Sequence, residues 1–408
     1  MSNSTSSPVM PAPSSTSTQT QTAIPTNVVL ASMLQVSPNV SDLIFSPGRP
    51  PQVEISGNLA GVKVGDLAML TAADTKRIAT DLMAGNTTAV EQLRVQGAAD
   101  LSYSLPGISR FRVNIFMQRG TCAIVMRVIP PEIPTFDKLR LPVQLREIAQ
   151  LKNGIVLVTG PTGSGKSSTL AAIIDMINET CCYHIVTIED PIEFIHRHKK
   201  GTVHQRELHS DTPSFALALR AALRQAPKVI LVGEMRDRET IEIALEAAET
   251  GHLVFSTLHT IDASKTVERI VGAFPLSEQQ LIRTRLAGSF RWIVSQRLMT
   301  RKDGKGRIAA VEILRSNMRT RDYMEKGESE GRSLLDAIND GGLDGMQSFD
   351  TELERFVREN QISIETALAY SSNQNNLRLA LSDFIEEQQS ELVSVASGPQ
   401  SSARTHMQ

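Results

Sequence analysis

The stretch Gly160-Pro-Thr-Gly-Ser-Gly-Lys-Ser167 determines how the rest of this sequence is interpreted. It matches the pattern G-x-x-x-x-G-K-[ST] and lies between an apolar strand-like run at 155–158 and a helical run at 170–174. Glycines in such a loop let backbone N–H groups turn toward one anion, the lysine reaches the β- and γ-phosphates, and the following hydroxyl binds Mg²⁺. We therefore predict a site for ATP and Mg²⁺, with Ser167 as a metal ligand. The predicted nucleotide-binding residues are Gly160, Pro161, Thr162, Gly163, Ser164, Gly165, Lys166, Ser167 and Ser168.

Apolar runs on both sides of this loop alternate with helical patterns, which is typical of a parallel sheet with crossover helices. The predicted strands are 155–159, 184–189, 229–232 and 253–258. Thr212-Pro213 predicts an N-cap followed by proline at the first helical position, and Ser277-x-x-Gln280 predicts a capping box. We expect the helix that follows this box to present an apolar face over residues 281–298.

Composition divides the chain into segments. The first residues are rich in Ser, Thr, Pro and Gln and have little to bury, whereas three prolines between residues 129 and 134 favour an extended connector. One helical stretch near 72–95 accompanies short strands such as 42–45 and 111–116. The predicted segments are a disordered tail (1–27), a small α+β domain (28–130), a linker (131–140), an α/β domain with a helical C-terminal part (141–376), and a C-terminal helix with a flexible tail (377–408).

Charge and cysteine content exclude several classes of protein. Lysine and arginine number 42 against 44 aspartate and glutamate, and Trp and Tyr total only five (one and four). Nucleic acid is therefore not the expected partner, because its recognition normally needs a basic surface and stacking platforms. Cys122, Cys181 and Cys182 form no C-x-x-C pair or disulfide framework, which favours a reducing compartment. With no signal peptide or membrane span recognised, we expect a cytoplasmic protein that reaches a membrane only through partners.

Three strand ends carry candidate catalytic residues. Glu234 follows the strand at 229–232 and is placed to accept a proton from, or orient, the water that attacks the γ-phosphate. Glu189 ends another strand in an acidic turn; such a turn is often only solvated, but its position between the phosphate loop and Glu234 favours a metal or water contact. His259 ends a third strand and is a candidate phosphate sensor, although a single histidine there is more often structural.

Four motifs occur in a fixed order: GPTGSGKS at 160–167, TIEDPIEF at 187–194, VILVGEMRD at 229–237 and GHLVFSTLHT at 251–260. With these motifs the sequence resembles the type II/IV secretion and pilus ATPase superfamily, and within it the PilT-type retraction ATPases. The resemblance covers about residues 28–370. It implies an α/β fold, in which a RecA-like P-loop ATPase domain follows a smaller α+β, PAS-like domain.

The resemblance extends to arginines of the first domain, which in this family reach the phosphates bound by the second. The matching residues are Arg112 and Arg127, with Arg110 as a near alternative. A planar, permanently charged guanidinium neutralises charge on the transferred phosphoryl group, which justifies including them as catalytic candidates. The alternative is that they lie on a solvated face of a sheet.

The sequence also departs from the family pattern in two segments. Ala226-Pro-Lys228 replaces the family's Asp-Pro-Asp, and Met318-Arg-Thr-Arg-Asp-Tyr-Met324 replaces an apolar-rich segment of the retraction subgroup. Asp344-Gly-Met-Gln-Ser-Phe-Asp350 restores part of the subgroup pattern.

The leading hypothesis is a hexameric ATPase at the cytoplasmic face of the inner membrane that powers type IV pilus retraction and twitching motility. Its implied partners are further copies of the chain, an inner-membrane pilus platform protein and paralogous pilus ATPases. The alternatives are a pilus assembly or type II secretion ATPase, a weakly hydrolysing auxiliary subunit and, least favoured, a nucleic-acid translocase.

Overall fold

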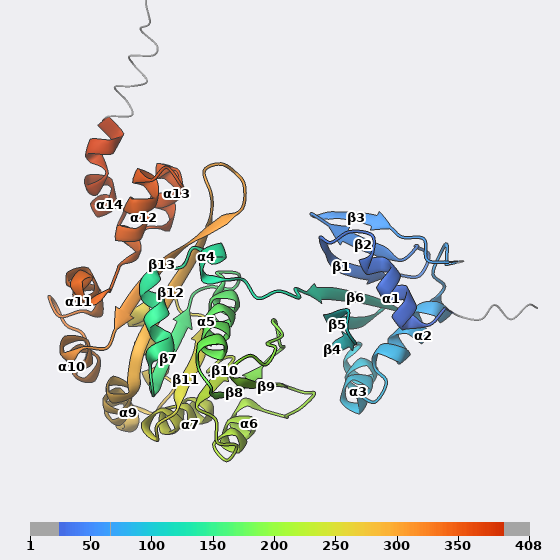
Figure 1. Ribbon diagram of the computed structural model, residues 1–408, viewed down its shortest axis with the longest axis horizontal. Helices are drawn as coiled ribbons and strands as arrows, with labels where there is room; N and C mark the ends of the chain where they lie inside the picture. Colours follow the sequence, from blue (N-terminus) through green and yellow to red (C-terminus); the bar gives the residue numbers. More distant parts are fainter. Residues whose placement is uncertain (1–23, 66, 387–408) are drawn as a thin grey trace, which may run out of the picture. The chain divides into compact units, whose positions relative to one another are not determined.

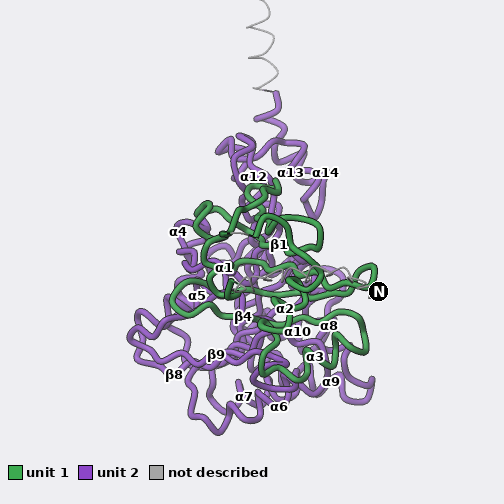
Figure 2. The backbone as a smooth tube through the Cα atoms, turned by 90° about the vertical axis from the view of Figure 1, so that its right-hand side faces the viewer, with its two compact units in different colours: residues 1–128 green, residues 129–408 purple. Residues whose placement is uncertain are grey.

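The computed structural model describes residues 24–65 and 67–386 (Figure 1). The chain divides into two compact units, and the division falls between Val128 and Ile129 (Figure 2). Most of the predicted N-terminal tail, residues 1–23, and the predicted flexible C-terminal tail, residues 387–408, lie outside the described residues. Helix α1 begins at Thr26, so the last residues of the predicted tail belong to the first unit.

In its described part, the first unit pairs a six-stranded sheet with three helices. Its elements are α1 (Thr26–Leu34), β1 (Val40–Phe45), β2 (Gln52–Ile55), β3 (Asn58–Gly61), α2 (Ala72–Leu82), α3 (Thr87–Gln96), β4 (Ala98–Leu105), β5 (Ser109–Gln118) and β6 (Thr121–Ile129). The strand order is β3-β2-β1-β6-β5-β4. One face of the sheet packs on the helices through a single apolar core. The predicted strands at 42–45 and 111–116 lie within β1 and β5.

The helical stretch predicted at 72–95 is two helices rather than one. Thr71 forms a capping box with Asp74 at the start of α2, and Asn86 caps α3 by accepting a hydrogen bond from the Ala89 N–H. Gly85 lies in the turn between them with φ +81°, a conformation that a β-carbon disfavours.

The segment predicted as a linker is only partly a connector. Residues 136–139 form α4 (Phe136–Leu139), and Phe136 is buried in a core of the second unit. The 3₁₀ helix η1 (Val143–Gln150) follows and buries Leu145 and Ile148 in the same core. The extended connector is therefore confined to the residues just after β6.

The second unit is built on a seven-stranded sheet with the order β13-β12-β7-β11-β10-β8-β9 (Figure 1). Every neighbouring pair is parallel except β12 and β13, which are antiparallel. Its strands are β7 (Gly154–Thr159), β8 (His184–Glu189), β9 (Thr202–Glu207), β10 (Val229–Val232), β11 (Leu253–Leu258), β12 (Phe290–Thr300) and β13 (Arg307–Arg315). All four predicted strands are present, and β9, β12 and β13 were not foreseen.

Helices cover both faces of this sheet, and side chains of β7 alternate between two cores. Ile155 and Leu157 face one core, whereas Val156 and Val158 face the other. A strand buried on both faces needs apolar residues throughout, which explains its continuous apolar sequence. The helices of the second unit are α5 (Lys166–Thr180), α6 (Phe215–Ala222), α7 (Arg238–Glu249), α8 (Ala263–Val271), α9 (Leu276–Ser289), α10 (Met318–Lys326), α11 (Leu334–Asp340), the 3₁₀ helix η2 (Gly342–Asp344), α12 (Phe349–Arg358), α13 (Ile364–Tyr370) and α14 (Gln374–Ala380).

Both predicted helix starts were wrong by a few residues. The N-cap of α6 is Ser214, whose hydroxyl accepts a hydrogen bond from the Leu217 N–H, so Pro213 precedes the cap. Helix α9 begins at Leu276 and has no side-chain cap, so the predicted capping box does not form.

The apolar face predicted for residues 281–298 was also wrong in extent. Helix α9 ends at Ser289, and β12 then continues the same apolar run as a strand paired with β7. Since apolar residues suit a buried strand as well as a buried helix face, the pattern alone did not show this change.

Candidate functional site

The phosphate loop connects β7 to α5 through three glycines with positive φ. At Gly160, where φ is +142°, a β-carbon would lie 2.5 Å from the Gln296 carbonyl oxygen. Gly163 and Gly165 have open space around them, but φ values of +81° and +93° disfavour other residues. Gly165 occupies the N-cap position of α5 without a capping side chain. The first N–H groups of this helix are therefore oriented as in anion-binding helix termini.

Lys166, the first residue of α5, lies inside the loop rather than in solvent. It is only 8% exposed, and its Nζ donates hydrogen bonds to the carbonyl oxygens of Gly160 at 2.8 Å and Pro161 at 3.1 Å. Burial lowers the pKa of this ammonium group, while the carboxylates of Glu234 and Glu193 act in the opposite direction. A cation held this way is well placed to interact with a phosphate on the loop.

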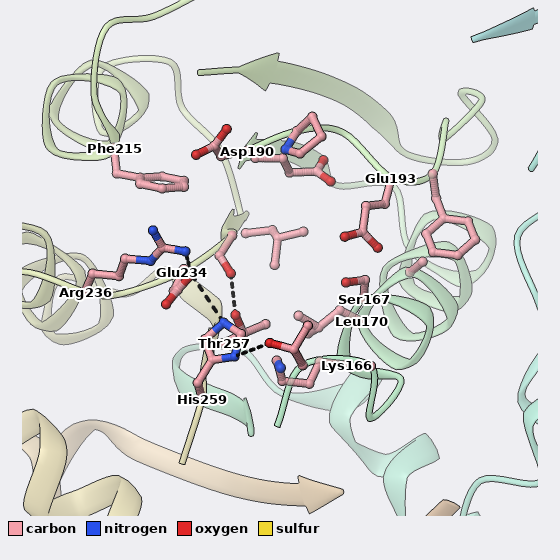
Figure 3. Close-up of a pocket in the computed structure, with 18 of the residues that line it drawn as sticks. Lys166, Ser167, Leu170, Asp190, Glu193, Phe215, Glu234, Arg236, Thr257 and His259 are labelled. Atoms are coloured by element: carbon pink, nitrogen blue, oxygen red, sulfur yellow. Dashed lines mark hydrogen bonds and ion pairs between the residues drawn. The ribbon is translucent and has the colours of Figure 1, made fainter. Parts of the chain in front are cut away.

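A hollow of about 230 Å³ adjoins the phosphate loop at the carboxyl ends of β8, β10 and β11 (Figure 3). This is the edge at which open α/β sheets bind ligands. The structure brings together here the predicted residues Lys166, Ser167, Glu189, Glu234 and His259. They come from separate segments of the second unit, so their meeting results from the strand order.

Glu234 is held by the side chains of Arg236 and His259. Its Oε2 lies 2.7 Å from Nη2 of Arg236 and 3.5 Å from Nε2 of His259, and its side chain is 17% exposed (Figure 3). The other ring nitrogen of His259 lies 3.4 Å from the Thr162 hydroxyl on the phosphate loop. His259 therefore connects the loop to Glu234.

Arg236 is a site residue that the sequence analysis missed. Residues 234 and 236 follow β10, and in an extended segment residues two apart point to the same side. This spacing is the signal that could have identified the arginine as a partner of Glu234. Its side chain is 70% exposed, so solvent screens much of the attraction between the two groups.

Glu189 lies at the end of β8, where burial is the main cause that raises the pKa of its carboxyl to about 7. Its Oε1 accepts hydrogen bonds from the Thr187 hydroxyl at 2.6 Å and from Gln205 Nε2 at 3.1 Å. Gln205 also donates to the Phe194 carbonyl and accepts from the His196 N–H. One amide on β9 thus fixes both the carboxyl and the acidic turn after it.

The oxygen groups around the hollow fit a magnesium ion shared with phosphates. Ser167, Glu189, Asp190 and Glu193 all line it. Within residues 24–65 and 67–386, no group of three His, Cys, Asp or Glu side chains has the geometry to hold a metal alone. Mg²⁺ typically takes one or two protein oxygens and completes its octahedral shell with phosphates and water, which matches this arrangement.

A second hollow of about 780 Å³ adjoins the phosphate loop and shares Gly163, Lys166 and Ser167 with the first. Its walls are α4, the start of α5 and the hairpin between β12 and β13. Basic side chains line much of this rim: Lys138, Arg140, Arg301, Lys305 and Arg307.

The predicted arginines Arg112 and Arg127 belong to the first unit. Phe111 and Val113 on either side of Arg112 are buried in the core, as is Met126 before Arg127. Because side chains alternate along a strand, both arginines lie on the sheet face opposite that core. Their predicted action on phosphates bound by the second unit remains a prediction.

The arginine candidates differ in their contacts. Arg127 Nε donates to Oδ1 of Asp42 at 3.1 Å, and the strand register pairs these two residues. Arg110 donates to the Ser104 hydroxyl. Arg112 is exposed on β5.

Comparison with known proteins identifies the family of this chain. The model of the family described as type II/IV secretion system protein matches residues 68–396. The chain belongs to this family. It is 43% identical to a twitching motility protein of Neisseria gonorrhoeae over 80% of this chain and 86% of that protein. It is equally identical to the type IV pilus retraction ATPase PilT of Pseudomonas aeruginosa, over 80% of this chain and 93% of that one.

A solved structure of the family agrees with the fold. The crystal structure of the pilus retraction motor PilT with bound ADP has a TM-score of 0.76 and 42% identity, and covers 86% of this chain and 98% of its own. The predicted family and fold class are thereby confirmed, and with them the classification of the chain as a PilT-type ATPase. Among the described residues, none of the helices has both the length and the apolar character of a membrane span.

Proposed function

We propose that this chain is an ATP-hydrolysing motor that drives retraction of a type IV pilus. The observation that carries the proposal is the contact sequence from Thr162 through His259 to Glu234, since it joins the phosphate loop to a carboxylate suited to act on water. The names of the relatives, a twitching motility protein and a retraction ATPase, support the direction of the motor.

In this proposal each side chain has a chemical task. The phosphate loop and Lys166 hold the β- and γ-phosphates, and the second hollow accommodates the rest of the nucleotide. Ser167, with help from Glu189, would hold Mg²⁺, which would supply positive charge to neutralise the phosphates. Glu234 orients the attacking water and accepts its proton, while Arg236 and His259 keep that carboxylate in place.

Arginines from the first unit would complete the charge neutralisation. We propose that this unit is the PAS-like N-terminal domain and that Arg112 or Arg127 approaches the phosphates held by a RecA-like domain. Such an arrangement would couple hydrolysis to rotation of one domain against the other. The proposed partners of this chain are further copies of itself in a six-membered ring, an inner-membrane platform protein at the cytoplasmic face and a paralogous motor. A relative named type IV pilus ATPase PilU, 37% identical over 90% of this chain, supports the existence of such paralogues.

The positions of the residues that differ from the family pattern argue against a weakly hydrolysing auxiliary subunit. Ala226 and Lys228 precede β10, whereas Glu234 follows it, so at about 3.3 Å per residue roughly 20 Å separate Lys228 from Glu234. Lys228 Nζ donates to the Gly251 carbonyl oxygen at this opposite edge of the sheet. The missing carboxylates therefore do not remove groups from the hydrolytic site.

Pilus length in living cells separates retraction from assembly. In a strain that lacks this protein, we expect retained or excess pili that no longer shorten. Complementation with Lys166→Ala should fail, while Lys76→Ala, which changes an exposed lysine on α2, should restore shortening. Loss of all pili in the deletion strain would contradict the proposal and favour the assembly alternative.

A further inference from the structure

We propose that Glu312 is a positioning residue that fixes the turn carrying His259 to the strands behind the phosphate loop. The inference rests on the proposed ATP hydrolysis and extends it to a side chain on β13. Glu312 is outside both hollows and touches neither of them.

The carboxyl of Glu312 lies in surroundings that would suit an apolar side chain. It is 2% exposed, and the neighbouring strand residues Val311, Ile313 and Leu314 are fully buried. A buried carboxylate costs several kcal/mol unless other groups compensate for lost hydration. The guanidinium of Arg297 attracts the Glu312 carboxylate electrostatically. This guanidinium, however, stacks on the Phe349 ring, 3.7 Å from the ring centroid. Stability alone therefore gives no reason for an acid at this position.

The hydrogen bonds of Glu312 show what the acid connects. Its Oε1 accepts from the Ala263 N–H at 2.9 Å, and the Ser295 hydroxyl on β12 also hydrogen-bonds to the carboxyl. The Ser295 oxygen in turn accepts from the Thr159 hydroxyl at 3.1 Å. Thr159 is the last residue of β7 and directly precedes the phosphate loop. A buried chain of polar groups thus runs from the base of that loop to the first residue of α8.

The turn that carries His259 ends at this anchor. Ala263 follows His259 by four residues, and its N–H is one of the helix-terminal donors that a capping side chain often leaves unpaired. The Asp262 side chain caps α8 at the Lys265 N–H, so Glu312 supplies the acceptor that Ala263 needs. The Thr260 hydroxyl in the turn lies 2.6 Å from the Thr266 hydroxyl on α8. These contacts fix the turn at its helical end.

His259 is sensitive to small displacements of this turn. Its contacts with Thr162 and Glu234, at 3.4 and 3.5 Å, are at the long end of the hydrogen-bonding range. A shift of a few tenths of an ångström would separate these groups. Without the Glu312 acceptor, the start of α8 could move away from β13, and His259 would lose its position between the loop and Glu234.

A double-mutant cycle between Glu312 and His259 tests the proposal on the full chain. Glu312→Met keeps the length of the side chain but removes the acceptor, and should lower kcat about tenfold while KM stays within about twofold. In a His259→Ala background the same substitution should change kcat less than twofold, because the residue it positions is absent. Glu312→Gln retains an oxygen for Ala263 and should stay within about twofold of the unmutated protein.

The matched control is Glu352→Gln, which changes another buried acid, on α12, that pairs with Arg355 at 2.7 Å; it should leave kcat unchanged. If Glu312→Met does not fold, Ser295→Ala removes the hydroxyl link alone and should lower kcat about threefold, again only when His259 is present.

Equal fold losses in both backgrounds, or no effect of His259→Ala on kcat, would overturn the positioning role. Absence of turnover in the unmutated protein would instead refute the proposed function, and with it this inference.

Discussion

Replacing Glu312 with glutamine should change how the stability of the protein depends on pH. Burial and the nearby Asp262 carboxylate raise the pKa of Glu312 to about 7 in the folded chain, against an ordinary 4.5, while Arg297 and hydrogen bonds act the other way. A carboxyl with a raised folded pKa contributes stability that is present below pH 4.5 and is lost as pH rises through 7. Glutamine does not titrate, so the variant escapes this loss.

The expected magnitude follows from the two pKa values. Between pH 5.5 and 8.5, the free energy of unfolding of the unmutated protein should fall by about 2 kcal/mol relative to Glu312→Gln. For a unit of this size, that corresponds to a relative decrease in melting temperature of roughly 4 to 8 °C.

Thermal or urea unfolding of both proteins at the two pH values measures this difference. Gln347→Met provides a control, since it alters a non-titrating side chain hydrogen-bonded to the Val311 carbonyl oxygen on the same strand. It should follow the pH dependence of the unmutated protein. Parallel curves for the unmutated protein and Glu312→Gln would refute the reasoning, as would a greater loss in the variant at high pH.

Two further expectations concern the phosphate loop and the first unit. Gly160→Ala should destabilise the protein by about 1 to 3 kcal/mol in urea unfolding, because its β-carbon would lie 2.5 Å from the Gln296 carbonyl oxygen. Gly163→Ala, with open space around it, should cost less, about 1 kcal/mol from backbone strain alone, and equal losses would contradict this. Arg112→Ala or Arg127→Ala should lower kcat by on the order of 10³-fold with little change in nucleotide affinity. If neither slows hydrolysis, the arginine assignment is wrong.

The central sheet was predictable where a buried parallel strand has a mainly apolar sequence. The four predicted strands are fully or largely buried parallel strands, whose mainly apolar sequences identify them. Strand β9, with the sequence Thr202-Val-His-Gln-Arg-Glu207, has few apolar residues because it lies at the edge of the sheet. Strand β12 was hidden because its apolar residues continued the pattern of α9.

The site was predictable to the extent that motifs specify it. The phosphate loop, Glu189, Glu234 and His259 each end a strand or follow one, so the carboxyl edge of a parallel sheet brings them together. Gln205 and Glu312 have no such signature. Their roles depend on which strands become neighbours, and that pairing is a long-range property of the fold.

Steady-state ATP turnover of the full chain with Mg²⁺ tests the central claim most directly. The unmutated protein should hydrolyse ATP, Lys166→Ala should lose both nucleotide binding and turnover, and Glu234→Gln should bind nucleotide but turn over at least about 10²-fold more slowly. Turnover of the unmutated protein at the background rate, or unchanged turnover in Glu234→Gln, would contradict the account.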